Sequence, residues 1–284
     1  MRYRRLGEPG RELPVACTDE GVFDLRALTV DVDGPFLGRV RPDVVRHEID
    51  RGRLPVLDGA ATLRVGAPIA RPGKVVCIGL NYRDHARETG GEPPDEPVVF
   101  LKDPATVVGP YDTVLIPRGS TKTDWEVELG VVIGTKARYL PDTRAAASCI
   151  AGYAISHDVS ERAFQLERGG QWDKGKSCET FNPLGPDLVT PDEVPDVQRL
   201  DLGLTVNGVP RQRSSTAEMI FGVHHLVWYL SQFMVLHPGD LINTGTPAGV
   251  GLGTPETPYL RPGDVVELSV TGLGIARQRF EAAS

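Results

Sequence analysis

Short apolar runs that end at glycine or proline constrain the fold of this chain more than any other feature of its sequence. The 284 residues include 32 Gly and 24 Pro, which recur between β-branched segments at 74–80, 97–102, 125–134 and 150–160. Glycine and proline start turns and interrupt helices, whereas β-branched side chains favour strands. Long helices do not regularly separate these runs, which disfavours a doubly wound parallel sheet. The pattern therefore predicts an α+β fold that is mainly β, with many turns.

A proline-containing connection at residues 64–74 divides the chain into two parts. Before it, short strands and one small helix near residues 41–52 predict a small N-terminal module, residues 1–70. After it, residues 71–284 are predicted to form a single catalytic domain, which is long enough to bury a core of its own.

One longer helix is predicted from residue 214 to residue 234. Ser215 and Glu218 have the spacing of a capping box at its start. His224 and His225 fall within it and are interpreted as packing or surface residues rather than as ligands. The apolar face of this helix is predicted to consist of Val223, Val227, Leu230 and Met234.

The charge balance and the cysteine spacing exclude several classes of function. Lys and Arg number 31 against 38 Asp and Glu, a formal net charge of -7 at pH 7. Nucleic-acid binding, which needs clustered positive charge, is therefore not expected. No apolar segment has the length of a signal peptide or a membrane span, so we expect no membrane association and a cytoplasmic location. The four cysteines are too widely spaced for a zinc site or a disulfide framework, and reduced thiols are expected.

Two glutamates interrupt a segment that otherwise reads as a buried strand. Side chains two residues apart on a strand share a face, so Glu126 and Glu128 point the same way, with Val127 and Leu129 opposite. Two buried carboxylates at close range raise the pKa of one of them unless a cation lies between them. An amphipathic strand with two solvated glutamates is the alternative. Asp158, which ends another apolar segment, adds a third carboxylate, and this oxygen-only set favours an open site for Mg2+, Mn2+ or Ca2+.

Basic groups in three other segments are candidates for the same site. His85 and Glu88 lie three residues apart, so on a helix Glu88 would orient the imidazole and raise its basicity. Lys102 and Lys176 are candidates for stabilising an anion. Each of these residues also has an ordinary interpretation, as a solvated helical pair or as a surface lysine.

A glycine-rich segment at residues 245–254 resembles a phosphate-binding loop. It lacks the lysine of such a loop, and no βαβ pattern surrounds it, which argues against nucleotide binding. Its backbone amides and Thr246 remain candidates for holding a substrate carboxylate.

Six segments resemble, in order along the chain, the motifs of the fumarylacetoacetate hydrolase family. They are GLNYRDHA, VVFLK, DWEVELGVVIG, HDVSERAFQ, KGKSCETFNPLGP and NTGTPAGVG, and they lie within residues 74–280. The resemblance implies a mixed β-sandwich roll that forms a homodimer. His157, Phe164 and Glu179 depart from the usual wording of the family, which leaves the substrate specificity open.

The resemblance also assigns roles to the residues that match the family motifs. It implies a Mg2+ or Mn2+ ion, replaceable by Ca2+ in a crystal, at the acids Glu126, Glu128 and Asp158. His85 and Glu88 match a catalytic dyad. The positions that match the substrate site are Arg162, Gln165, Lys176 and Thr246, with Lys102 close to them.

Together, the residues and the resemblance suggest hydrolysis of an acylpyruvate, a small-molecule 2-oxo acid. In this scheme His85, oriented by Glu88, activates a water that attacks carbon 4, and cleavage between carbons 3 and 4 releases pyruvate and a second acid. Lys176 or Lys102 would help to stabilise the developing negative charge. The wording at residues 119–134 and 164–177 resembles the branch that includes 2,4-diketo-3-deoxy-sugar-acid hydrolases and acylpyruvases.

Other activities on the same fold stay open at this point. Decarboxylation of oxaloacetate, and decarboxylation or tautomerisation of 2-hydroxy-dienedioates, would use the same metal site. A non-catalytic homologue is a remote alternative, which the presence of the complete set of motif residues disfavours.

Overall fold

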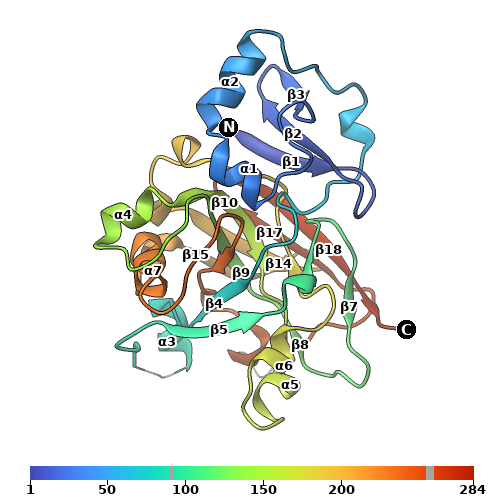
Figure 1. The fold of residues 1–284 in the computed structure, drawn as a ribbon. Helices are drawn as coiled ribbons and strands as arrows, with labels where there is room; N and C mark the ends of the chain where they lie inside the picture. Colours follow the sequence, from blue (N-terminus) through green and yellow to red (C-terminus); the bar gives the residue numbers. More distant parts are fainter. Residues whose placement is uncertain (90–91, 254–258) are drawn as a thin grey trace.

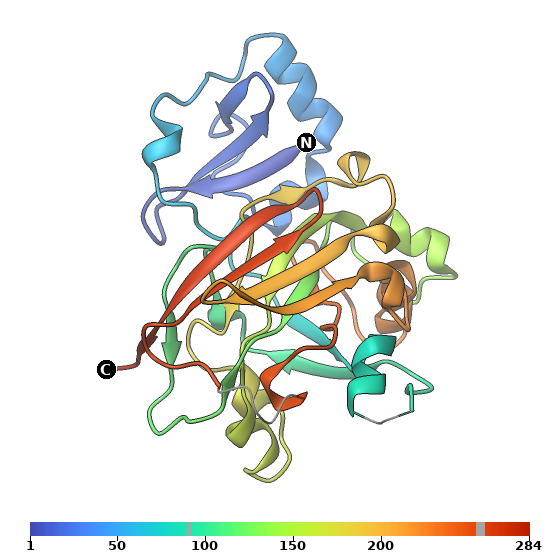
Figure 2. The same ribbon diagram turned by 180° about the vertical axis from the view of Figure 1, so that it is seen from behind.

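The computed structural model describes residues 1–89, 92–253 and 259–284, apart from the side chains of Ala86, Glu88 and Thr89. Figures 1 and 2 show a large twisted sheet packed against a smaller one, with short helices around them. In order across the large sheet, the strands are β3 (Gly21–Asp24), β2 (Leu13–Thr18), β1 (Arg2–Leu6), β13 (Leu188–Val189), β10 (Ile150–His157), β9 (Val127–Ile133), β16 (Leu241–Asn243), β4 (Val75–Gly79) and β5 (Val98–Lys102). The smaller sheet has the order β15 (Val209–Ser215), β14 (Asp201–Val206), β17 (Val265–Val270), β18 (Gly274–Ala282) and β7 (Val114–Ile116).

Short elements connect these sheets. Two strand pairs stand apart from them: β11 (Ser160–Glu161) with β8 (Thr123–Asp124), and β12 (Asn182–Pro183) with β6 (Val107–Val108). The α-helices are α1 (Gly34–Arg39), α2 (Pro42–Asp50), α3 (Arg83–Thr89), α4 (Thr143–Ala147), α5 (Arg162–Leu166), α6 (Asp173–Lys176) and α7 (Val223–Leu230). The 3-10 helices are η1 (Ala60–Thr62), η2 (Pro104–Thr106), η3 (Pro191–Glu193), η4 (Val197–Arg199), η5 (Thr216–Glu218) and η6 (Gly251–Gly253).

The main core lies between the two sheets. Strands β9 and β10 of the large sheet pack against β14 and β17 of the small one. Val127 and Leu129 from β9 meet Leu204 and Leu268 in this core. Most strand pairs are antiparallel, but β16 pairs with β4, β18 with β7, and β12 with β6 in parallel. The predicted α+β fold, mainly β and of the mixed-sandwich type, is confirmed.

The N-terminal strands continue the large sheet. Strand β1 pairs with β13, so β1, β2 and β3 form one edge of the sheet that carries β9 and β10. A second core cluster joins Tyr3 and Phe36 of this part to Val75 and Leu188 of the remainder. The helix expected near residues 41–52 is α2. Residues 1–70 thus share a sheet and a core with the rest of the chain, while their status as a separate module stays a prediction.

The helix predicted from residue 214 to residue 234 is wrong in its first half and in its last four residues, because α7 ends at Leu230 and leaves Met234 outside the helix. Strand β15 extends to Ser215, whose side chain accepts a hydrogen bond from the Ala217 amide at the start of η5. The helix α7 begins only at Val223. Pairing of β15 with β14 outweighs the capping signal, because the strand buries its backbone groups in a sheet. The apolar face is correct where the helix exists, since Val223, Val227 and Leu230 are buried.

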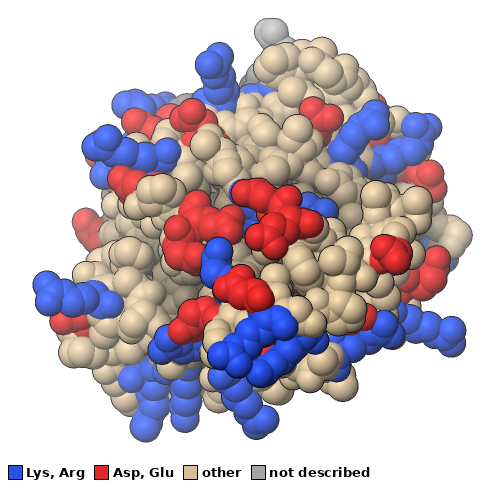
Figure 3. Space-filling view, turned by 90° about the horizontal axis from the view of Figure 1, so that it is seen from above, with Lys and Arg blue, Asp and Glu red and all other residues tan. Residues whose placement is uncertain are grey.

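The remaining general expectations concern thiols, membrane and surface charge. All four cysteines are free thiols. Among the described residues, no helix is both long enough and apolar enough to cross a bilayer. On the face shown in Figure 3, acidic side chains interrupt the basic ones, so the positive charge there is not continuous. The absence of nucleic-acid binding stays a prediction.

Candidate active site and metal centre

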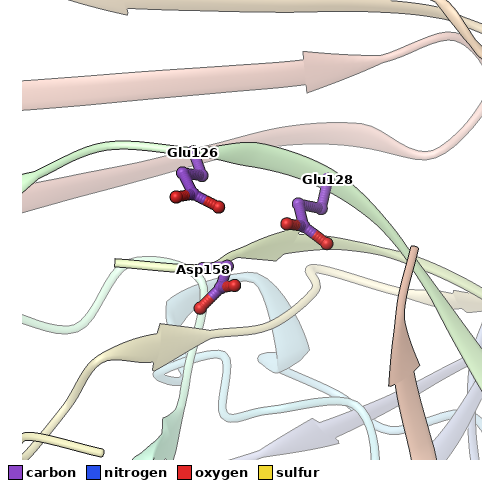
Figure 4. A group of neighbouring side chains, drawn as sticks. All are labelled: Glu126, Glu128 and Asp158. Atoms are coloured by element: carbon purple, nitrogen blue, oxygen red, sulfur yellow. The ribbon is translucent and has the colours of Figure 1, made fainter. Parts of the chain in front are cut away.

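Antiparallel pairing of β9 with β10 brings the three predicted acids together. Glu128 lies in β9 opposite Ser156, and the Asp158 amide donates a hydrogen bond of 3.1 Å to the Glu126 carbonyl just beyond the paired strands. Glu126, Glu128 and Asp158 are all buried, and each offers a carboxylate oxygen within 4.8 Å of the others. Figure 4 shows the three carboxylates converging from the two strands.

Three buried cations surround these carboxylates. Lys102 at the end of β5 is bonded to Asp158 and donates to the Phe181 carbonyl at 2.7 Å. Lys176 at the end of α6 lies 2.8 Å from Asp158 Oδ2 and 3.0 Å from Glu126 Oε1. Arg162 at the start of α5 lies 2.7 Å from the same Glu126 oxygen. The two lysines predicted as candidates are therefore buried partners of the acids and not surface residues.

A fourth carboxylate, Asp124, was missed by the sequence analysis. It accepts hydrogen bonds from Arg162 Nε at 2.8 Å and from the amides of Gly251 and Leu252 at 2.7 and 3.0 Å. Asp124 thereby connects a substrate-site candidate to the backbone of η6. Its position two residues before Glu126 in an alternating segment was a usable signal, since i and i+2 share a face of an extended chain. We call Asp124, Glu126, Glu128, Asp158, Lys102, Arg162 and Lys176 the charged cluster.

Electrostatics differ sharply between the two glutamates. Burial would raise the pKa of Glu126, but the charges of Lys176 and Arg162 outweigh it and lower the pKa to about 2. The pKa of Glu128 is raised well above its ordinary value by burial, and further by the charges of Asp158 and Glu126. Glu128 Oε2 accepts only a neutral donor, the Gly245 amide, at 2.8 Å. Glu128 is thus the carboxylate that lacks a neighbouring cation in direct contact among the described residues.

This arrangement fits a divalent cation. The charged cluster holds four carboxylates and three cations, so one negative charge remains to be compensated when all are ionised. A cation next to Glu128 would remove the repulsion that raises its pKa. Because each carboxylate oxygen has two lone pairs, Asp158 and Glu126 can accept hydrogen bonds from lysine and still offer a lone pair. A set of oxygen donors suits magnesium, manganese or calcium.

A cavity of about 150 Å³ lies beside the charged cluster. Glu126, Arg162 and Lys176 contribute to its wall, as do the other predicted site residues His85, Gln165 and Thr246. The cavity therefore joins side chains from α3, α5, α6 and the turn after β16. Its remaining lining is largely apolar and consists of Ile78, Gly79, Leu80, Phe100, Leu166, Trp172, Val250 and Leu252.

The predicted catalytic and substrate residues are placed as follows. His85 is buried on α3 and lines the cavity. The side chain of Glu88 lies outside the described residues, so the proposed dyad stays a prediction. Gln165 Oε1 accepts a hydrogen bond of 3.0 Å from Arg162. The Thr246 hydroxyl donates to the Val127 carbonyl at 3.1 Å and accepts from Gln212 at 2.9 Å, so it is held in place by the two sheets.

His157, which departs from the usual family motif, lies beside the acids without lining the cavity. Its Nδ1 is 2.9 Å from Gln278 Oε1, and its Nε2 has no partner among the described residues. Burial lowers its pKa to about 4. The imidazole is therefore neutral near pH 7, and it contributes no charge to the site.

Comparison with known proteins gives one consistent family. Residues 74–281 match the model of the fumarylacetoacetate (FAA) hydrolase C-terminal domain. A protein of Burkholderia multivorans, whose name states only a hydrolase, is 48% identical over the full length of both chains.

Solved structures agree with this match over the whole chain. A Mycobacterium smegmatis protein of the HpcE type has a TM-score of 0.89 at 38% identity, and it covers 100% of both chains. Fumarylacetoacetate hydrolase from Exiguobacterium antarcticum has a TM-score of 0.86 at 33% identity, again with full coverage of both chains. Other matched structures include isomerases as well as hydrolases. On these matches, and with the fold and the acidic triad described above, the chain belongs to the fumarylacetoacetate hydrolase family.

Proposed function

We propose that this protein is a divalent-metal-dependent hydrolase that cleaves the carbon-carbon bond of an acylpyruvate to pyruvate and a second acid. The observation that carries the proposal is the buried triad Glu126, Glu128 and Asp158 next to a cavity that also exposes His85 and two cations. Family membership supports an enzyme with a small-molecule substrate. The acylpyruvate specificity and the choice of Mg2+ or Mn2+ are part of the proposal.

The three carboxylates would hold the metal through oxygen atoms. When bound, the metal would supply positive charge that attracts the carboxylate and 2-oxo oxygens of the substrate. The same charge would stabilise the negative charge that develops on the pyruvate fragment. The ligands themselves are preorganised: Glu126 is ionised because of Lys176 and Arg162, and Asp158 is held between Lys102 and Lys176. These contacts fix the orientation of the ligands before any ion arrives.

His85 is the proposed general base. It lines the same cavity as Glu126, and in this proposal it deprotonates a water bound in that cavity. The hydroxide adds to carbon 4, the bond between carbons 3 and 4 breaks, and its electron pair leaves with the pyruvate fragment. A proton then returns to carbon 3, which completes pyruvate and the second acid. Glu88 would orient His85, as the sequence motif suggests.

Lys176 and Arg162 are proposed to stabilise negative charge and hold the substrate. Burial lowers the pKa of Lys176, but the charges of Asp158 and Glu126 outweigh it and the pKa is raised. Lys176 therefore remains an ammonium ion, able to stabilise an anion but not to act as a base near neutral pH. Gln165 and Thr246 are proposed to contact the substrate, and Lys102 to support Asp158.

A second candidate activity has support from the family matches. Among the solved relatives is a 2-hydroxyhepta-2,4-diene-1,7-dioate isomerase of Mycobacterium marinum. Isomerisation or decarboxylation of a 2-oxo acid would use the same charged cluster without water attack at carbon 4. The protein from Sphingobium, in contrast, is a maleylpyruvate hydrolase.

Product analysis distinguishes these activities. The protein is loaded with Mg2+ or Mn2+ and offered acylpyruvates, a 2,4-diketo-3-deoxy sugar acid, oxaloacetate and a 2-hydroxy-dienedioate, and products are followed by mass spectrometry. Hydrolysis predicts pyruvate and an equimolar second acid, abolished by a chelator. Carbon dioxide without a second acid, or an isomer of unchanged mass, would instead assign a decarboxylase or an isomerase.

The assembly and location remain proposals with direct tests. We propose a homodimer, which light scattering at low and high protein concentration would measure. A cytoplasmic location is proposed as well, and fractionation of expressing cells would test it.

A further inference from the structure

We infer that the cavity binds an acylpyruvate whose acyl group is a short, uncharged alkyl chain, rather than one that carries a second carboxylate or several hydroxyl groups. The inference rests on the proposed function, since it concerns the part of the substrate that points away from the triad. Four observations carry it: the apolar rim, the exposure of its leucines, the packing of Trp172 and the pairing of the cations.

The lining of the cavity contains charged and apolar side chains. Glu126, Arg162 and Lys176 are its buried charged residues. Six of its apolar side chains are called the apolar rim: Leu80, Phe100, Leu166, Trp172, Val250 and Leu252. The lining also includes Ile78, Gly79, His85, Gln165 and Thr246. A 2-oxo carboxylate matches the charged residues, so the acyl group would lie against the apolar rim.

Three leucines of the apolar rim are unusually exposed. Leu80, Leu166 and Leu252 are 40%, 44% and 43% exposed, and they come from the turn before α3, from α5 and from η6. They are three of the four leucines among the exposed large apolar side chains of the described residues; the fourth, Leu101, does not line the cavity. Single exposed apolar residues are ordinary, but convergence of three from separate segments on one cavity marks a binding surface.

Trp172 forms a fixed wall within the apolar rim. Its ring contacts Phe100 edge-on, with centroids 5.4 Å apart. It also packs so closely on Gly79 that a Cβ there would lie 2.8 Å from Trp172 Cζ3. Phe100 is itself held below the Lys176 ammonium, 5.1 Å from its ring centroid. The wall thus offers a rigid aromatic surface that suits a hydrocarbon chain.

The cations of the cavity are already paired with protein carboxylates. Arg162 contacts Asp124 and Glu126, and Lys176 contacts Glu126 and Asp158. Among the described residues that line the cavity, no further lysine or arginine is present at the apolar rim. A second carboxylate in the acyl group would therefore give up part of its hydration to apolar side chains without gaining a cationic partner, and several hydroxyl groups would meet the same problem in weaker form.

The cavity volume restricts the acyl group further. At about 150 Å³ it is smaller than the roughly 300 Å³ at the low end for drug-sized ligand sites. A chain of a few carbons is therefore the expected length.

Substrate comparison tests the inference directly. The metal-loaded protein is offered 2,4-dioxopentanoate, 2,4-dioxoheptanoate, the matched 2,4-dioxoheptanedioate, and a 2,4-dioxo acid with a hydroxylated acyl group. We expect kcat/KM to rise by about fourfold for each added methylene until the cavity is filled. The dicarboxylate should be at least about tenfold poorer than its alkyl counterpart. Preference for the dicarboxylate or the hydroxylated acid would overturn the inference.

Two variants test whether the apolar rim causes the preference for an alkyl chain. Leu166→Asn and Leu252→Asn are expected to reduce the kcat/KM advantage of 2,4-dioxoheptanoate over 2,4-dioxopentanoate by severalfold. Leu101→Asn is the matched control, because Leu101 is 46% exposed but lies outside the cavity. An equal effect of Leu101→Asn would show that the leucines of the apolar rim do not determine the preference for the acyl group.

Binding without turnover separates this inference from the proposed function. Calorimetry on the metal-loaded protein compares pyruvate, 2-oxohexanoate and 2-oxoadipate, which lack the 4-oxo group that hydrolysis needs. Tighter binding of 2-oxohexanoate than of the other two supports the apolar rim even if no acylpyruvate is cleaved. Hydrolysis with tighter binding of 2-oxoadipate would retain the proposed function and reject the inference.

Discussion

The charged cluster and the apolar rim lie beside the same cavity but are built in opposite ways. The charged cluster is buried, and its three proposed metal ligands lie in or next to β9 and β10, where sheet pairing fixes the backbone. Lys102 ends β5, whereas Arg162 and Lys176 come from α5 and α6. The apolar rim is exposed at its three leucines and comes mainly from turns and short helices. The difference shows how one site can keep a fixed chemistry while its substrate range depends on loop residues. The following predictions test this contrast, from the largest expected effect to the smallest.

Asp158→Asn should have the largest effect. It removes the negative charge that contacts both Lys102 and Lys176, and breaking such a buried pair costs about 3–5 kcal/mol of stability. Metal affinity and turnover should both be lost. Denaturant unfolding in metal-free buffer and metal titration calorimetry measure the two effects. Asp240→Asn is the control, because buried Asp240 pairs with Lys74 away from the cavity and should lower stability without changing metal affinity.

His85→Ala should reduce turnover by about 10²–10⁴-fold, the usual contribution of a general base. Metal affinity should stay unchanged, since His85 is not one of the proposed ligands. Steady-state kinetics and calorimetry on the same preparation provide the measurement. His224→Ala on α7 is the matched control and should keep wild-type activity. Simultaneous loss of metal binding in His85→Ala would remove His85 from the role of base.

Glu128→Gln should abolish metal binding without destabilising the metal-free protein at pH 7. The pKa of Glu128 is raised in the folded state by burial and by the neighbouring acids, so its contribution to stability is complete below the ordinary carboxyl pKa and is lost as pH rises toward the folded value. A neutral glutamine avoids that loss. Thermal unfolding across pH in metal-free buffer should therefore show a flatter neutral-side slope for Glu128→Gln. A steep loss of stability in the variant would contradict the repulsion argument.

Metal binding should release the same proton in the wild-type protein. While Glu128 is protonated, affinity should rise with pH by up to about tenfold per unit, because the ion binds the carboxylate. Calorimetry in two buffers of different ionisation enthalpy would count the protons released. A pH-independent affinity would show that Glu128 is already ionised in the metal-free protein.

Asp124 connects the charged cluster to the apolar rim, and Asp124→Asn should have an intermediate effect. It weakens charge-assisted contacts to Arg162 and the η6 amides, each worth about 1.5–3 kcal/mol. We therefore expect kcat/KM to fall by about tenfold or more. The loss should appear mainly as a higher KM, because Asp124 positions Arg162 and Leu252. Asp112→Asn, which weakens a pair with Arg64 outside the cavity, is the control. A pure loss of kcat would assign Asp124 a closer part in the chemistry.

Gly79→Ala should have the smallest effect and should act on the rim alone. The added methyl group would displace the Trp172 ring, at a cost of about 1–3 kcal/mol, and shift chain-length preference by a few fold. Metal affinity should not change. In a Trp172→Ala background the methyl group has space, so the second substitution should add little. Equal effects in both backgrounds would mean that contact with Trp172 does not determine the rim.

The sequence alone determined the acidic triad of the site and the type of fold. Alternation in 125–134 and the acid at the end of 150–160 identified Glu126, Glu128 and Asp158, because strand periodicity is a local property that survives in the tertiary structure. The strand-rich α+β class followed from short apolar runs and turns in the same way. The start of α7 did not, because the pairing of β15 with β14 decides the conformation of Ser215 and its neighbours.

Only the tertiary structure decided how these residues interact. Lys102 and Lys176 had the appearance of isolated lysines, and their burial against Asp158 arises from strands and helices far apart in sequence. The same is true of Asp124, which meets the η6 amides more than 120 residues later, with a sequence separation of 127 to Gly251. Trp172 packs on Gly79 although the two residues are also far apart in the sequence. Charge pairing and close packing depend on distances between side chains, and a linear pattern contains no information on distances between segments that the fold brings together.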